Sequence, residues 1–212
     1  MSPRFRPVSP PCHLGAIEAP DARPHCGVMS MLAAALAITI RVYDLYGLST
    51  DTRQEALAVA AEALARAGVE AIIVDCSARP AAAACKLGLG DGEVVLRIHR
   101  LPKDGAHTLG DAIVRGENGP STIATVYAAA IAERARRTGG NLATIVGRVS
   151  AHELGHLLLG SNVHASHGLM RPSWDLQRVD RGDWDFTAED AATIRSRLQR
   201  RTAAALLARA DR

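Results

Sequence analysis

The chain has 212 residues, of which 48% are hydrophobic and 22% charged, and its formal net charge is +3. This length is enough for one well-buried domain and leaves little for a second. The composition is typical of a soluble globular protein, and the positive charge is too weak to indicate a nucleic-acid partner.

The N-terminal segment has the composition of a region outside the folded domain. Residues 1–26 are rich in proline and lack hydrophobic periodicity, so we expect them to be disordered. Residues 28–40 carry no charge. Such a run is short for a bilayer span and matches the apolar part of a secretory signal. The alternative is that residues 31–43 form an apolar element of the core.

A pattern of small residues lies at the end of this apolar run. Ala35 and Ala37 flank Leu36, and cleavage after Ala37 would release a chain that begins at Ile38. We therefore predict residues 1–37 as a disordered N-terminus with a signal segment, followed by one domain over 38–212. The signal predicts a secreted or periplasmic protein without a stable membrane span after cleavage. The true start and the cleavage site stay open.

A βαβ unit is predicted next. Residues 38–44 alternate and are rich in β-branched side chains, as strands are. Thr52 and Glu55 form a capping box, which predicts a helix that runs to Ala67. Residues 69–74 are almost continuously apolar, as expected for a buried parallel strand. A strand, a helix and a second strand in this order form a right-handed crossover.

Cys76 and Cys85 bracket the loop after the second strand, where a disulfide would fit an oxidising compartment. Two free thiols in a cytosolic protein are the alternative. Further strands are predicted at residues 92–99, 111–115 and 122–127, with turn residues between them. The last strand leads into a helix near residues 128–137.

The stretch from Asn141 to Leu159 is predicted to be one buried helix. Asn141 is a suitable N-cap, Gly160 is a suitable stop, and apolar residues cover a broad surface. Two histidines and a glutamate inside such a helix need polar partners, because unpaired buried polar groups are costly. Coordination of a metal ion would supply them.

His152, Glu153 and His156 have the spacing of a zinc site. Two histidines four residues apart lie on one face of a helix, so both rings can reach one ion. The glutamate beside that ion can take a proton from water. A catalytic zinc needs three protein ligands and an open position, and His164 is well placed as the third ligand. His167 stays the main alternative, and an acid from elsewhere, such as Glu189, is a further one.

The segment from His152 to Trp174 (HELGHLLLGSNVHASHGLMRPSW) resembles the metzincin zinc peptidases, and more narrowly a group of bacterial secreted proteins with metzincin-like features. The resemblance implies His152, His156 and His164 as zinc ligands. It also implies Glu153 as general base and Met170 as the methionine of a turn under the metal.

This sequence departs from the metzincin pattern in its spacing. Gly160 lies four residues after His156, where the pattern has three, and His164 lies eight residues after it, where the pattern has six. No tyrosine follows Tyr127, so the tyrosine that assists some metzincins has no equivalent here. Trp174 either lines the cleft or packs in the core, and the sequence does not separate these roles.

The predicted fold is α/β (α+β), a metzincin-like zincin with a mixed twisted sheet, a βαβ start, a buried zinc helix and a C-terminal helix that Thr187 caps. The resemblance implies an antiparallel strand near the cleft that pairs with an extended substrate. Either residues 111–115 or residues 122–127 fit that role.

The function that we predict is a zinc-dependent endopeptidase acting on a protein or peptide substrate, with Zn²⁺ as cofactor and Glu153 as general base. One alternative is a non-catalytic zinc-binding module, in which His167 joins the three other histidines in a closed site. The other is a cytosolic peptidase that processes a regulator. The sequence is silent on cleavage specificity and on oligomeric state.

Overall fold

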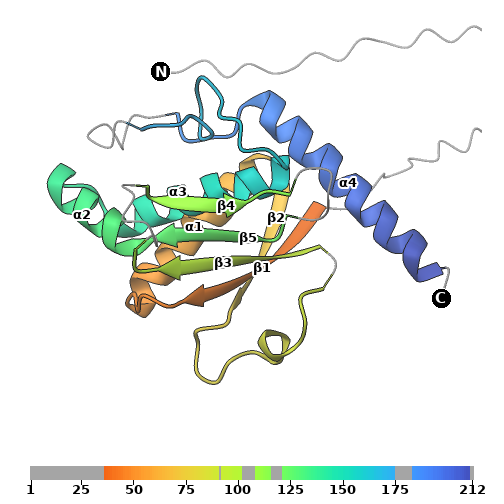
Figure 1. Ribbon diagram of the computed structural model, residues 1–212, viewed down its shortest axis with the longest axis horizontal. Coiled ribbons are helices and arrows are strands. Elements are labelled where there is room, and N and C mark those ends of the chain that lie inside the picture. Colours follow the sequence, from red (N-terminus) through yellow and green to blue (C-terminus); the bar gives the residue numbers. More distant parts are fainter. Residues whose placement is uncertain (1–35, 91, 102–107, 116–120, 175–182, 211–212) are drawn as a thin grey trace, which may run out of the picture. The chain divides into compact units, whose positions relative to one another are not determined.

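The computed structural model describes residues 36–90, 92–101, 108–115, 121–174 and 183–210, which contain a five-stranded mixed sheet. In spatial order β2-β1-β3-β5-β4, the strands are β2 (Val69–Asp75), β1 (Leu36–Asp44), β3 (Glu93–His99), β5 (Ile123–Tyr127) and β4 (Gly110–Ile113). β4 pairs antiparallel with β5 at one edge, and the other pairs are parallel (Figure 1). The predicted mixed sheet is confirmed, and β4 is the antiparallel edge strand.

Two helices pack together against the sheet. α1 (Thr50–Arg66) contacts β2, and α3 (Leu142–Leu159) contacts β4 and β5. The two helices also contact each other. Inward side chains of the strands, such as Ile40 and Leu96, are buried beneath them. Gly147 permits this close packing, because a Cβ at that position would lie 2.4 Å from the carbonyl oxygen of Ala56. α2 (Ala128–Thr138) precedes α3 in the chain. α4 (Ala188–Ala210) packs against α3.

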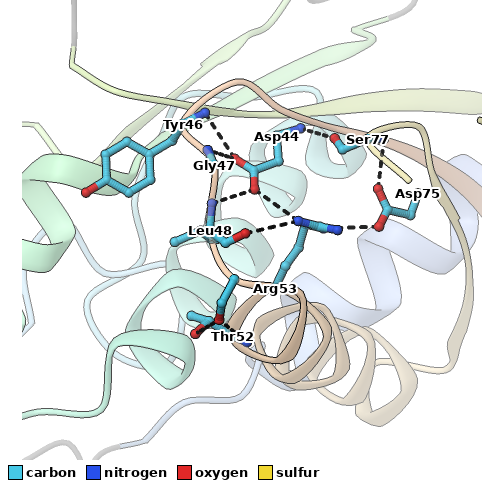
Figure 2. Close-up of polar contacts among 9 residues, drawn as sticks. Asp44, Tyr46, Gly47, Leu48, Thr52, Arg53, Asp75 and Ser77 are labelled. Atoms are coloured by element: carbon cyan, nitrogen blue, oxygen red, sulfur yellow. Dashed lines mark hydrogen bonds and ion pairs between the residues drawn. The ribbon is translucent and has the colours of Figure 1, made fainter. Parts of the chain in front are cut away.

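The start of α1 differs from the prediction. Ser49 is the N-cap, and its hydroxyl accepts a hydrogen bond from the backbone N–H of Thr52 at 3.2 Å. Thr52 therefore lies inside the first turn, and the predicted capping box with Glu55 is wrong. The reason is the preceding turn, where the carboxylate of Asp44 accepts backbone hydrogen bonds and fixes the chain ahead of Ser49 (Figure 2).

β1 begins earlier than the predicted strand. Leu36 and Ala37 pair with Val69 and Glu70 of β2, so they belong to the sheet. Residues 1–35, which hold most of the predicted disordered and signal segment, lie outside the described residues. Cleavage and secretion therefore stay predictions. In the part of the chain that the structure describes, no helix is long and apolar enough to cross a membrane.

Two further predictions are confirmed. Cys76 and Cys85 form a disulfide, with their Cα atoms 5.5 Å apart, and the loop between them contains a short 3₁₀ helix, η1 (Ala83–Lys86), which was not predicted. Thr187 and Asp190 form the capping box of α4. The Thr187 hydroxyl accepts from the Asp190 N–H at 3.0 Å, and the Asp190 carboxylate accepts from the Thr187 N–H at 3.2 Å.

Candidate metal centre

The local sequence of α3 fixes where its polar residues lie. Asn141 is the N-cap, and its side-chain oxygen accepts from the Thr144 N–H at 2.8 Å. Gly160 ends the helix in the left-handed conformation, with φ of 60°. The helix is buried along most of its length. His152, Glu153 and His156 are only 7%, 7% and 5% exposed.

The two helix histidines point their Nε2 atoms at each other. His152 Nδ1 lies 2.9 Å from the carbonyl oxygen of Leu169, and His156 Nδ1 lies 2.8 Å from that of Ser161. A carbonyl oxygen can only accept, so in each ring Nδ1 carries the hydrogen and Nε2 has the free lone pair. The two Nε2 atoms lie 3.1 Å apart. This is the arrangement that a metal ion requires of its histidine ligands.

The loop after α3 brings a third imidazole to this pair. The ring centroid of His164 lies 5.2 Å from that of His152 and 4.9 Å from that of His156. One ligand atom from each of the three rings lies within 4.8 Å of the others. The connection from His156 to His164 is two residues longer than in the metzincin pattern. The chain turns at Gly160, and the His164 ring still lies close to the other two rings.

The alternative ligands lie elsewhere. His167 is exposed, its Nδ1 is 3.2 Å from the hydroxyl of Ser166, and it does not join the cluster. Glu189 is exposed in the first turn of α4, where its charge favours the helix dipole. Among the described residues, the cluster that could hold a metal is therefore His152, His156 and His164.

The electrostatics of the cluster fit a divalent cation. Burial lowers the pKa of His152 to about 4, and it also lowers the pKa of His156, so both rings are neutral at neutral pH, which is the form of histidine that can bind a metal. Burial, followed by the nearby charge of Asp111, raises the pKa of Glu153 to about 8. A carboxylate held there without a cation is therefore disfavoured, and a bound metal would compensate its charge.

Met170 lies directly under the helix. It is fully buried, and a Cβ at Gly155 would lie 2.5 Å from its sulfur atom, so Gly155 leaves the room that the methionine fills. The turn before it needs a glycine as well. Gly168 has φ of 73°, and a Cβ there would lie 2.8 Å from the carbonyl oxygen of Asp185. Met170 thus packs against the helix segment that carries the two histidines, and its role in a turn under a metal stays a prediction.

A cleft of about 580 Å³ opens over the three histidines and Glu153. Residues 108–112, which include the first three residues of β4, form one part of its wall, and residues 171–174 form another. β4 lies so close to α3 that a Cβ at Gly110 would meet the Glu153 side chain at 2.7 Å. The glutamate therefore packs against the edge strand, at a cleft that the three histidines also line.

The sequence reasoning missed Asp111 at this cleft and its partner Tyr127 behind it. Asp111 lines it, and the hydroxyl of Tyr127 donates a hydrogen bond to the Asp111 carboxylate. Burial, followed by this hydrogen bond, raises the pKa of Tyr127 to about 12. No local pattern marks the pair, because it forms across β4 and β5. Trp174 both lines the cleft and packs against the core, so it combines the two roles that the sequence left open.

Comparison with known proteins gives a likeness of fold. No family model and no curated protein matches the sequence. A zinc-dependent peptidase from Methanocorpusculum labreanum is similar in structure, with a TM-score of 0.50 and 12% identity, over 73% of this chain and 99% of that one. An archaemetzincin from Methanopyrus kandleri matches 80% of this chain and 99% of its own, with a TM-score of 0.48 and 18% identity. The likeness to the Methanocorpusculum labreanum peptidase shows that the described chain shares the fold of that zinc-dependent peptidase, which agrees with the fold predicted from the HExxH segment.

Proposed function

We propose that this chain is a zinc-dependent peptidase, in which His152, His156 and His164 bind the metal and Glu153 is the general base. The observation that carries the proposal is the convergence of three imidazoles on one point at the floor of an open cleft. Each buried ring donates its Nδ1 hydrogen to a backbone carbonyl and thereby directs its other nitrogen inward. Such hydrogen bonds orient metal ligands in zinc enzymes.

Zinc bound there would polarise a substrate carbonyl and make a water molecule more acidic. Glu153 is the group that accepts the proton of that water and passes it to the leaving amine. It suits this role because it makes no hydrogen bond with any described residue and because its side chain contacts the cleft. Gly110 leaves it just enough room on the β4 side.

The edge strand β4 suits an extended peptide. It pairs with β5 on one side, and no other described strand pairs with its outer side. Residues 110–112 of this strand also line the cleft. We propose that a peptide adds to β4 by backbone hydrogen bonds, so that its scissile bond lies over the histidines.

The cleft favours this function over a purely structural zinc site. A structural site is closed by four protein ligands, whereas the cluster here contains three rings and His167 is directed to Ser166. The secreted location remains a separate prediction. N-terminal sequencing of the native protein, together with a thiol assay for Cys76 and Cys85, distinguishes an exported chain from a cytosolic peptidase.

The decisive experiment compares the wild type with Glu153→Gln. Metal content is measured by mass spectrometry of the purified proteins, and cleavage is measured with a peptide library. We expect one zinc per chain in both proteins and a loss of cleavage rate of about 10²- to 10⁴-fold in the variant. Glu189→Gln is the matched control, because this carboxylate is exposed on α4 and should leave the rate unchanged.

Two outcomes would contradict the proposal. Wild-type rates in Glu153→Gln would remove its role as the base. Zinc binding without any cleavage by the wild type would instead support a non-catalytic module.

A further inference from the structure

Trp174 packs against one of the three histidines. Its ring centroid lies 5.2 Å from that of His152, and the two ring planes are 86° apart. This edge-to-face arrangement is a favourable one for aromatic rings. Trp174 is half-buried in the wall of the cleft, so the contact lies beside the proposed metal position. The indole therefore restricts the directions in which the imidazole can turn.

The same tryptophan shares a hydrogen-bond acceptor with His152. The carbonyl oxygen of Leu169 accepts from His152 Nδ1 at 2.9 Å and from Trp174 Nε1 at 3.3 Å. A carbonyl oxygen has two lone pairs, so these two donors fill it. The indole N–H thus occupies the position from which a water molecule would otherwise compete for this carbonyl.

The peptide that carries this carbonyl is itself held at both ends. The Leu169 N–H donates to the carbonyl of Asp185 at 2.7 Å, and the carbonyl of Met170 accepts from the Ala165 N–H at 2.9 Å. Ala165 directly follows His164 in the chain. One short segment therefore connects the orientation of His152 with the loop that supplies the third ring.

We propose that Trp174 is a positioning residue of the metal centre, which holds the His152 ring so that its Nε2 faces the other two imidazoles. The inference rests on the proposed function, since it requires that the three rings bind a metal. Trp174 acts through His152 and the Leu169 carbonyl and does not bind the metal itself.

A second tryptophan supports the first. The ring of Trp184 lies 5.3 Å from that of Trp174, at an angle of 73°, and the guanidinium of Arg148 lies 4.0 Å over the Trp184 ring. Arg148 is one turn before His152 on α3. The stack Arg148–Trp184–Trp174–His152 begins and ends on the same helix, which explains how the indole of Trp174 keeps its place at the edge of an open cleft.

The test measures the dissociation constant of zinc by competition with a chromophoric chelator. In Trp174→Ala both the ring contact and the N–H are lost, and we expect zinc binding to weaken by about 10- to 100-fold. Trp174→Phe keeps a ring against His152 but loses the N–H, so we expect a loss of about two- to tenfold. Trp184→Phe keeps an aromatic ring against Trp174, so we expect a smaller loss than in Trp174→Ala. Leu206→Ala is the control, because this exposed side chain on α4 lies outside the stack and the cleft and its loss should leave zinc affinity unchanged.

Wild-type zinc affinity in Trp174→Ala would overturn the inference. A rise in KM without a change in zinc affinity would also overturn it, because Trp174 would then be only a wall for the substrate. A wild-type chain that binds no zinc would overturn this inference and the proposed function together. Zinc binding without peptidase activity would overturn the proposed function alone.

A spectroscopic measurement gives an independent readout. The chain has two tryptophans, so Trp174 is the only one in Trp184→Phe. Because its ring lies beside His152, Co²⁺ added to this variant should quench its fluorescence, with a midpoint equal to the Co²⁺ dissociation constant from chelator competition. Unquenched emission at full Co²⁺ occupancy would contradict the geometry. If Trp174→Ala does not fold, this quench and the phenylalanine variant decide the question.

Discussion

The polar network around Arg53 and the polar cluster on α3 are both buried, but they differ in how their polar atoms are paired. In the first, the Asp44 carboxylate accepts three backbone N–H groups at 2.8–3.0 Å and the Arg53 guanidinium at 3.2 Å. Arg53 also donates to Asp75 at 3.0 Å, so two carboxylates surround one cation (Figure 2). Every charge in this network has a partner within the chain.

In the second cluster, the inward-facing atoms have no such partners. Glu153 makes no hydrogen bond with the described residues, and the Nε2 atoms of His152 and His156 face each other. Burial alone therefore does not identify a functional site, because a buried polar group with all its partners present stabilises the fold. The α3 cluster is distinguished by polar groups that no described residue pairs.

The largest expected effect on stability comes from breaking the paired network. Arg53→Met leaves the buried Asp44 carboxylate without its cation, which typically costs about 3–5 kcal/mol of unfolding free energy. Urea denaturation measures this loss. The control is Arg136→Met, which removes an exposed ion pair with Glu133 and should cost less than about 1 kcal/mol. Equal losses in the two variants would contradict the contrast between the regions.

The second prediction concerns His152 in the metal-free protein. Its pKa is about 4 in the folded chain and 6.5 ordinarily, so the unfolded chain takes up the proton first as pH falls. The stability that the neutral ring contributes is complete above pH 6.5 and is lost towards pH 4, on the order of 3 kcal/mol.

Urea denaturation with a chelator isolates this effect when Glu153→Gln is compared with the double variant Glu153→Gln/His152→Gln. The single variant should lose stability between pH 6.5 and pH 4, and the double variant should lose less. Parallel pH profiles would mean that His152 is not held neutral by burial.

The third effect is that of Glu153, which has the opposite sign and is the smallest of the three within the pH window that is measured, from pH 6.5 to pH 8. Its pKa is about 8 in the folded chain and 4.5 ordinarily, so folding favours the protonated acid. The stability that it contributes is complete below pH 4.5 and is lost as pH rises through 8. Between pH 6.5 and pH 8 the metal-free wild type should lose about 2 kcal/mol relative to Glu153→Gln.

Saturating zinc provides the control for this prediction. A cation beside Glu153 favours the carboxylate, so the loss between pH 6.5 and pH 8 should disappear when zinc is bound. Equal slopes for the metal-free wild type and Glu153→Gln would show that the acid is not perturbed.

The sequence predicted the parts of this protein that depend on neighbouring residues. α3 begins after the cap Asn141 and ends at the cap Gly160, as expected, because both caps act within one turn of the helix. The spacing of His152 and His156 placed two rings together for the same reason. Ser49 was missed as the cap of α1, because Asp44, which is not local to the helix, fixes the turn before it.

Contacts between distant segments could not be predicted. The pairing of Asp111 with Tyr127 depends on the register of β4 and β5, and the packing of Trp174 on His152 depends on the path of the loop between them. The choice between His164 and His167 also required that path, since both lie on the same loop and the metzincin spacing fits neither. The resemblance favoured His164, and the loop geometry brings that ring to the other two.

The most direct test of the metal centre is the visible absorption of bound Co²⁺ in the wild type, His164→Ala and His167→Ala. Three imidazoles and an open position should give the wild type and His167→Ala the same intense spectrum with one Co²⁺ per chain, and His164→Ala should lose that spectrum and bind the ion far more weakly. A spectrum that survives the loss of His164 and disappears with the loss of His167 would contradict the account.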